Sequence, residues 1–225
     1  KAGIVSHVES IRALMQLQPE CDLGVVLFVE GEEEAGSPSF DAFLAAYKDE
    51  LAADVIIVAD STNFTAEIPA LTVSLRGNVT LNVTIRTLDH ALHSGMFGGA
   101  VPDAFMAFNQ MIASCYAHDG TCSIPGIQGV EMDTPEYTEQ QIRSESGVLD
   151  GVELIGNGPI LNRLWNSPTL TVTGIDVPPV HEASNTLLPS VRARLSLRIP
   201  PTIDAHGAAE TVIARSEEHT SELQS

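Results

Sequence analysis

The sequence reads Val25-Val-Leu-Phe-Val-Glu-Gly-Glu-Glu-Glu-Ala-Gly-Ser37 where a short apolar run meets four carboxylates. The apolar run, 23–29, has the length and composition of a buried strand. Gly31 and Gly36 supply turn residues directly after it. Carboxylates at the carboxyl end of a buried strand lie where open α/β sheets hold their ligands, although an acidic run can also be an ordinary solvated loop.

A second apolar run, 54–59, also reads as a buried strand and ends in Asp60. Between the two runs, a helix is predicted over 39–52, with Ser39 as its cap. A crossover of this length makes the two strands parallel, and their connection is right-handed. Both acidic strand ends therefore lie at one edge of the sheet. Such a carboxylate cluster suits hard or borderline divalent metal ions.

Charge and composition limit the function classes. The chain has 225 residues, a net charge of −19 and a pI near 4.5, which argues against binding to nucleic acid or to anionic membrane surfaces. No apolar run approaches the roughly 20 residues of a membrane span. An odd set of cysteines, Cys21, Cys115 and Cys122, predicts reduced thiols and a cytoplasmic protein, with a Cys115–Cys122 disulfide as the alternative.

The pattern changes near Pro69, after which apolar and polar residues alternate over 70–87. A period of two predicts half-exposed, antiparallel strand structure. A Gly-rich loop with two histidines follows over 89–102, and the remaining elements indicate a two-layer α+β domain. These elements are helices over 102–116, 138–144 and 204–214, and strands over 169–174 and 191–199.

The sequence also leads to an expectation for each end of the chain. The segment Arg215 to Ser225 resembles the conceptual translation of a sequencing adapter, and we expect it not to be native protein. The chain opens at Lys1, without Met and inside a helical pattern over 1–17. We therefore expect that the natural N-terminus lies upstream.

Four motifs resemble, in the same order, those of the two-metal exopeptidase family, which includes carnosinase-type dipeptidases, glutamate carboxypeptidase, acetylornithine deacetylase and succinyl-diaminopimelate desuccinylase. The motifs are Glu30-Gly-Glu-Glu-Glu-Ala-Gly-Ser37, Val58-Ala-Asp60, Leu92-His-Ser-Gly-Met-Phe-Gly-Gly-Ala-Val-Pro102, and Asn185-Thr-Leu-Leu-Pro189 followed by Leu195-Ser-Leu-Arg198. The third is similar to the lid loop of the dipeptidase branch.

The resemblance implies a fold class and a domain division. The fold would be α/β, with a partial parallel-sheet zinc-exopeptidase catalytic domain over 1–68. An inserted two-layer α+β (ferredoxin-like) domain over 69–214 would form the lid and mediate dimerisation. The rest, 215–225, would be the adapter artefact.

In the catalytic part, the resemblance implies that Glu33 is the general base and that Glu34 and Asp60 are metal ligands. The cofactors would be two divalent metal ions, zinc in the first place, with manganese or cobalt as alternatives. Two such ions lower the pKa of a bridging water, and a carboxylate beside them can take its proton and pass it to the leaving amine.

In the lid, the resemblance implies that His93 crosses a dimer interface and helps to hold the substrate's oxyanion in the partner's active site. Such a donor contributes roughly 3 kcal/mol to transition-state stabilisation. Arg198, with Asn185 and Thr186, would bind the carboxylate or backbone of a small peptide-like substrate. An arginine suits a carboxylate because its donor fork is planar and bidentate.

The family's His-x-Asp motif and bridging Asp would precede Lys1, and its last metal-binding His has no counterpart here. Two hypotheses follow. The first is a cytoplasmic, homodimeric metallopeptidase or amidohydrolase that cleaves a peptide or amide bond in a small substrate, a dipeptidase in the first place, with this chain an incomplete and inactive fragment. The alternative is a catalytically silent dimerisation module.

Overall fold

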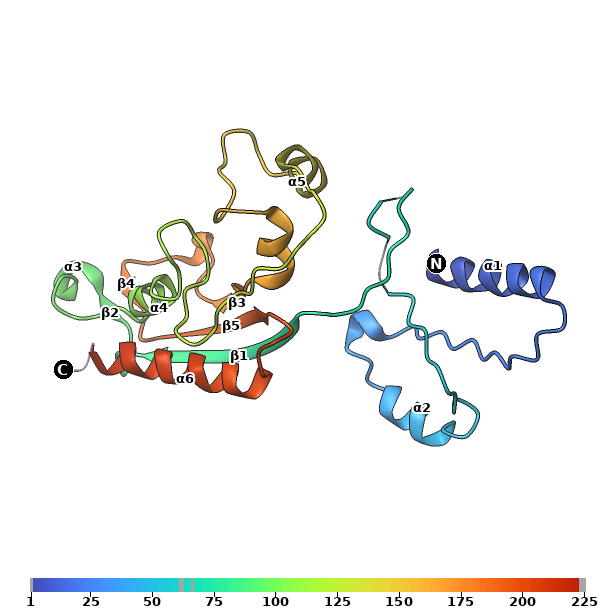
Figure 1. Cartoon of the computed structure of the whole chain (residues 1–225). Coiled ribbons are helices and arrows are strands. Elements are labelled where there is room, and N and C mark those ends of the chain that lie inside the picture. The colour runs from blue at the N-terminus through green and yellow to red at the C-terminus, as the bar shows by residue number, and fades with distance from the viewer. Residues whose placement is uncertain (1, 61–62, 66, 223–225) are drawn as a thin grey trace. The chain divides into compact units, whose positions relative to one another are not determined.

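The computed structural model describes residues 2–60, 63–65 and 67–222, and the chain divides into two compact units, 1–72 and 73–225 (Figure 1). The first unit contains helix α1 (Ala2–Leu17), the short 3₁₀ turn η1 (Glu33–Ala35) and helix α2 (Phe40–Ala46). Helix α1 confirms the helical pattern predicted over 1–17 for positions 2–17, whereas position 1 lies outside the described residues. Helix α2 begins where predicted but ends six residues before the predicted end at position 52.

The two strands predicted in the first unit are not formed. Among the described residues of that unit, neither 23–29 nor 54–59 is paired into a sheet. Their apolar side chains stay exposed, from 39% for Phe28 to 78% for Ile56. Parallel strands need neighbouring strands and helices on both faces to bury such side chains, and two short strands alone cannot supply that cover.

The second unit contains a larger set of elements. They are β1 (Gly77–Arg86), β2 (Leu92–His93), α3 (Ser94–Phe97), α4 (Ala104–Ala113), α5 (Glu139–Ser146), the π turn η2 (Asn162–Asn166), β3 (Thr169–Asp176), η3 (Val180–Glu182), β4 (Thr186–Leu187), β5 (Ser190–Ile199) and α6 (Ala205–Glu222). Strands β1, β5 and β3 form an antiparallel sheet in that order, and β2 pairs with β4 separately.

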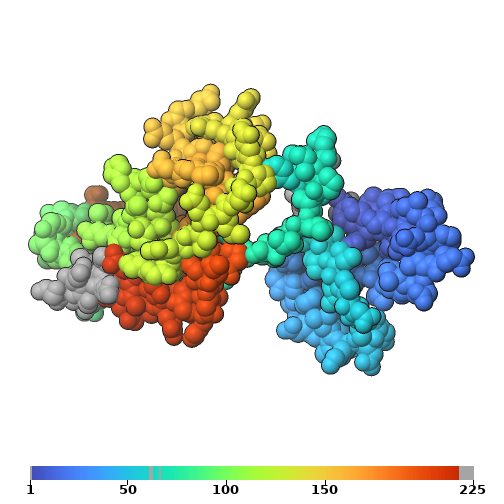
Figure 2. All heavy atoms as spheres, in the orientation of Figure 1, coloured from blue at the N-terminus to red at the C-terminus, as the bar shows by residue number. Residues whose placement is uncertain are grey.

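This sheet has one apolar and one polar face. The odd-numbered positions of β5, from Val191 to Ile199, are buried, whereas the arginines between them are exposed. Helices α4 and α6 pack against the apolar face and against each other. Figure 2 shows α6, in red, as a continuous ridge along one side of the unit. The result is a two-layer arrangement with one open, polar sheet face.

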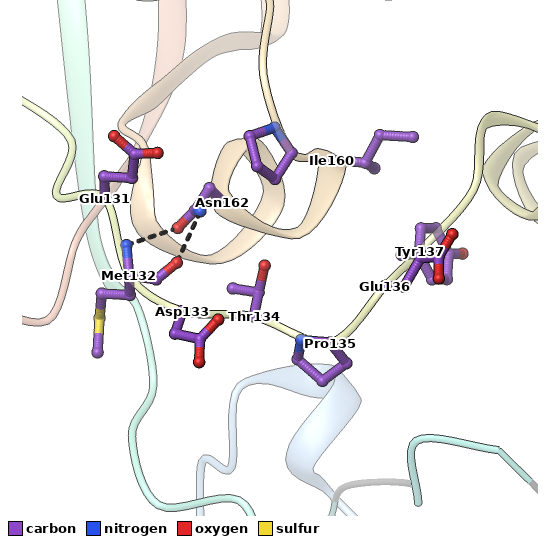
Figure 3. A pocket seen from close by; sticks show the side chains of 10 residues that line it. Glu131, Met132, Asp133, Thr134, Pro135, Glu136, Tyr137, Ile160 and Asn162 are labelled. Carbon is purple, nitrogen blue, oxygen red and sulfur yellow. Dashed lines mark hydrogen bonds between the residues drawn. The ribbon is translucent and has the colours of Figure 1, made fainter.

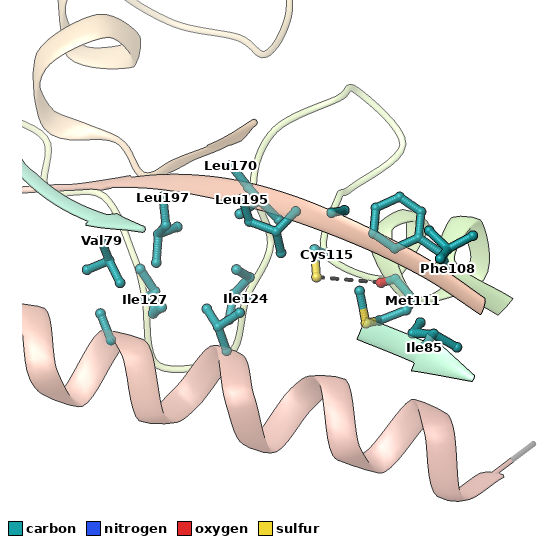
Figure 4. Packing of buried hydrophobic residues seen from close by; sticks show 14 of the residues in the cluster. Val79, Ile85, Phe108, Met111, Cys115, Ile124, Ile127, Leu170, Leu195 and Leu197 are labelled. Atoms are coloured by element: carbon teal, nitrogen blue, oxygen red, sulfur yellow. Dashed lines mark hydrogen bonds between the residues drawn. The ribbon is translucent and has the colours of Figure 1, made fainter. Parts of the chain in front are cut away.

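The core lies between the sheet and these helices (Figure 4). Leu195 and Leu197 are almost completely buried, and Ile124 and Ile127 lie between them and α6. Each such side chain contributes roughly 1.5–3 kcal/mol when it is fully buried. Ile124 and Ile127 come from a segment whose structure the sequence did not indicate.

The order strand, helix, strand, strand, helix confirms the α+β architecture predicted for the second unit. A ferredoxin-like sheet has four strands, whereas the main sheet of the described residues has three. Helix α6 continues to Glu222, beyond the predicted end at 214. No helix of the described chain is long and apolar enough to cross a bilayer.

Candidate functional site

Three of the four predicted lid residues lie together in the structure. Strand β2 places His93 directly opposite Thr186 of β4. The amide of Ser94 donates to the carbonyl of Asn185 at 2.9 Å. Residues that are more than 90 positions apart in the sequence therefore form one short polar ribbon, with His93 and Thr186 exposed at its surface.

The His93 ring has a defined orientation. The amide of Gly95 donates to His93 Nδ1 at 3.1 Å, so the imidazole caps the first turn of α3. Because Nδ1 accepts this bond, the neutral ring carries its proton on Nε2, which is left as a donor. A Cβ atom at Gly95 would lie only 3.0 Å from His93 Cε1, so any larger residue here would push against the ring in this orientation.

Asp103 ties this ribbon to α4, a role that the sequence did not reveal. Its Oδ1 accepts from the amides of Phe105 and Met106, and its Oδ2 accepts from the amide of Leu188 at 2.5 Å. The prediction placed Pro102 inside the helix, but α4 begins at Ala104 with Asp103 as its cap. An aspartate directly before an apolar helical pattern is a recognised capping signal and could have indicated this start.

Arg198, the fourth predicted lid residue, lies apart from the ribbon that contains His93. It sits near the far end of β5, opposite Asn78 of β1 and Thr169 of β3. The eight residue steps from Ser190 to Arg198 span about 26 Å of strand. A dipeptide is about 7 Å long, so one such substrate cannot touch both Arg198 and the His93 ribbon of the same protomer.

The acidic turn in the first unit is held by two of its four glutamates. Ser37 Oγ donates to Glu30, and Ser39 donates to Glu32 Oε2 through its hydroxyl at 2.5 Å and its amide at 3.2 Å. The hydroxyl first, and then the amide, lower the pKa of Glu32 from its ordinary value. Gly36, at φ 83°, closes the turn. Ser39 therefore stands at the start of α2 without capping it through its side chain, contrary to the prediction.

Glu33 and Glu34 form the exposed first turn of η1, and their carboxylates make no hydrogen bond with the described residues. Asp60 is also exposed and, within the described part of the chain, makes no contact with that turn through a hydrogen bond or ion pair. No group of three metal-ligating side chains gathers among the described residues. The carboxylates have the right chemistry for a divalent ion, but they do not form a metal centre by themselves in this arrangement.

An open groove of about 580 Å³ lies in the segment that the sequence left unassigned (Figure 3). It is lined by Glu131, Met132, Asp133, Thr134, Pro135, Glu136, Tyr137, Pro159, Ile160 and Asn162. The buried amide of Asn162 exchanges two hydrogen bonds with the backbone of Met132, at 3.0 and 2.8 Å, as a neighbouring strand would. Asn166 donates to the same Asn162 oxygen at 2.7 Å and holds this amide in place.

The chain is similar in sequence to known peptidases. The model of the peptidase dimerisation domain of the M20 family matches residues 73–223. The cysteinylglycine-S-conjugate dipeptidase of Corynebacterium striatum is 33% identical over 216 residues, which cover 94% of this chain and 47% of that protein. The Beta-Ala-His dipeptidase of Rattus norvegicus is 26% identical over 219 residues, covering 89% of this chain and 43% of that protein.

Solved structures agree in fold. Human carnosine dipeptidase 1 has a TM-score of 0.67 at 25% identity, with 87% of this chain and 44% of that chain covered. The di-peptidase Dug1p of Saccharomyces cerevisiae has a TM-score of 0.69 at 22% identity, with 87% and 43% covered. The chain thus spans less than half the length of the relatives it matches, and the expected likeness to the dipeptidase branch is confirmed.

Proposed function

Because this chain belongs to the M20 peptidases through their dimerisation domain, we propose that it takes part in the metal-dependent hydrolysis of dipeptides. The observation that carries this proposal is the fixed orientation of His93. Its Nδ1 atom is occupied by the amide of Gly95, so Nε2–H is available as a donor beside Thr186. A preorganised donor of this kind stabilises the negative charge that develops on a scissile carbonyl oxygen.

The separation of Arg198 from the His93 ribbon supports a site built from two protomers. Ser190, three residues after the ribbon, is separated from Arg198 by about 26 Å of strand, with β2 and β4 beyond the start of β5 (Figure 1). A dipeptide cannot span this length within one chain, whereas a homodimer can bring one chain's Arg198 near its partner's ribbon. In this arrangement Arg198 of one protomer holds the substrate's carboxylate. His93, Asn185 and Thr186 of the other protomer hold the carbonyl and backbone.

We assign the proton transfers to Glu33, which takes a proton from the attacking water and returns it to the leaving amine. Glu34 and Asp60 are the proposed ligands of the divalent metal ions, two zinc ions in the first place. The dipeptidase relatives support this assignment, among them the Cys-Gly metallodipeptidase of Schizosaccharomyces pombe. The exposure of all three carboxylates leaves them accessible to such partners.

The test is hydrolysis of Cys-Gly and β-Ala-His by the complete protein that carries this chain, with zinc or manganese present and after chelation. We expect chelator-sensitive cleavage that falls by about 10²–10⁴-fold in Glu33→Gln, because that change removes the base without changing the size of the side chain. Glu32→Gln is the matched control, since Glu32 is engaged by Ser39 in the turn. Full, chelator-sensitive activity in Glu33→Gln would refute the assignment of the base.

A second candidate is a dimerisation module without catalysis. The match of the dimerisation-domain model to residues 73–223 is the observation behind it. Sedimentation combined with zinc titration separates the two candidates. A dimer that binds no zinc and cleaves no dipeptide would support the module, and stoichiometric zinc binding with turnover would exclude it.

A further inference from the structure

Positive charge gathers on the open face of the main sheet. Four arginines occupy exposed positions of β1 and β5, although the chain as a whole has a net charge of −19. With Arg76, which directly precedes β1, they account for five of the 11 basic residues of the chain: Arg76, Arg86, Arg192, Arg194 and Arg198. The three strands contribute one acidic side chain, Asp176.

Arg76 and Arg198 lie close together at one end of this face. Asn78 is the cross-strand partner of Arg198, and Arg76 precedes Asn78 by two residues, so all three positions share one face. Such diagonal neighbours have their Cα atoms about 7–8 Å apart, within reach of long side chains. A Cβ atom at Gly77 would lie 2.7 Å from Ile199 Cγ1, so the start of β1 lies tightly against β5.

Neither guanidinium has a negative partner in the part of the chain that the structure describes. Arg76 Nη1 is buried there without a hydrogen-bond acceptor. Burial first, and the charge of Arg198 second, lower the pKa of Arg76 from its ordinary value. Two like charges and a buried, unsatisfied donor are unfavourable unless an anion compensates them.

We propose that Arg76 and Arg198 together form a carboxylate-binding site, in which Arg76 is a further specificity-determining residue. Asn78 completes the set of donors. Its Oδ1 accepts from Ser196 Oγ at 3.0 Å, which leaves its Nδ2 group facing the same side of the sheet. Two guanidinium forks and an amide can satisfy all the acceptor sites of one carboxylate. That this carboxylate is the C-terminus of a dipeptide rests on the proposed function.

The experiment is an NMR titration of the 225-residue chain without added metal, observing the arginine Nε–Hε signals. The probes are acetate, glycylglycine and glycylglycinamide, the last of which lacks the carboxylate. We expect acetate and glycylglycine, but not the amide, to move the Arg76 and Arg198 signals. Arg76→Gln should lower the affinity for acetate and for glycylglycine about tenfold. Arg76→Lys should lower it less, because lysine keeps the positive charge but loses the planar fork of the guanidinium.

Arg86→Gln is the matched control, since Arg86 lies on the same face at the opposite end of β1. This variant should bind acetate and glycylglycine with the affinity of the wild type. The melting temperatures of all variants should show that they are folded. Equal affinity in the wild type and Arg76→Gln would overturn the site, whether or not the protein cleaves dipeptides. Acetate binding that depends on Arg76, in a protein that cleaves no dipeptide, would support the site and count against the proposed function alone.

Discussion

His93 is held at Nδ1 by the amide of Gly95, and this bond decides which ring nitrogen can act on a ligand. The lid motif predicted a role for His93 from the sequence. The motif could not give the ring's orientation, because that depends on a backbone amide two residues away and on the absence of a Cβ atom there. The sequence predicts that Thr186 binds the substrate together with Arg198, yet the pairing of β2 with β4 places Thr186 beside His93.

Gly95→Ala should disturb this orientation while leaving the fold intact. The added Cβ would lie 3.0 Å from His93 Cε1 and 3.2 Å from Nδ1, so the ring must shift and its bond to the amide of residue 95 weakens. We expect the ¹⁵N shifts of the ring to change from the Nε2–H tautomer to a mixture of the two. Gly24→Ala, where an added Cβ meets nothing within 4 Å, should leave the His93 spectrum unchanged. A pure Nε2–H tautomer in Gly95→Ala would contradict the role of this bond.

The cysteines give a prediction of pH dependence. Burial raises the pKa of Cys122 to about 11 and also raises that of Cys115, whereas Cys21 is exposed. A raised pKa means less thiolate at neutral pH, so iodoacetamide should label Cys21 first at pH 8 and Cys122 only as the pH approaches 11. The stability from the buried thiol is present below pH 9.0 and is lost as the pH rises to about 11. Equal labelling of Cys21 and Cys122 at pH 8 would contradict this.

At the scale of elements, the sequence predicted those that carry their own pattern. Strand β5 alternates buried and exposed positions without a break, and α5 has a complete capping box between Thr138 and Gln141. The strands expected over 23–29 and 54–59 are not formed, because their apolar side chains need neighbouring strands and covering helices that no local sequence pattern supplies. Outside α5, the structure of segment 118–167 could not be predicted for a similar reason, since it depends on single polar contacts such as that of Asn162 with Met132.

The contact of β1 with β5 at Gly77 can be tested by adding one methyl group. Gly77→Ala should lower the free energy of unfolding by about 1–3 kcal/mol, because Ile199 must move out of its buried position. Gly174→Ala on β3 is the matched control in the same sheet, where the new methyl meets nothing within 4 Å. Urea denaturation of both variants measures the difference. A Gly77→Ala protein as stable as Gly174→Ala would exclude a close contact at this position.

The two units differ in how they are stabilised. The second unit has a buried core and a fully paired central strand. The first has clustered aromatic rings, such as Phe28 stacked on Phe43 at 5.2 Å, but no buried residue in either of its helices. This contrast matches the finding that the family model covers residues 73–223.

Amide hydrogen exchange should reveal this contrast. In the structure, the amides of 23–29 form no hydrogen bond with the described backbone, whereas those of β5 are paired on both sides. We expect the amides of 23–29 to exchange about a thousandfold faster than those at the centre of β5. Protection of 23–29 equal to that of β5 would mean that this segment is part of a sheet after all.

The proposed active site combines residues of two protomers, and complementation between two inactive variants tests this assembly. Neither His93→Gln nor Glu33→Gln homodimers of the complete protein should cleave β-Ala-His at more than a small fraction of the wild-type rate. Mixed after dissociation and reassociated, they should recover about a quarter of that rate, because half of the dimers then hold one intact site. No recovery, with heterodimers verified by mass spectrometry, would contradict a shared site and place His93 and Glu33 of the same protomer in each site.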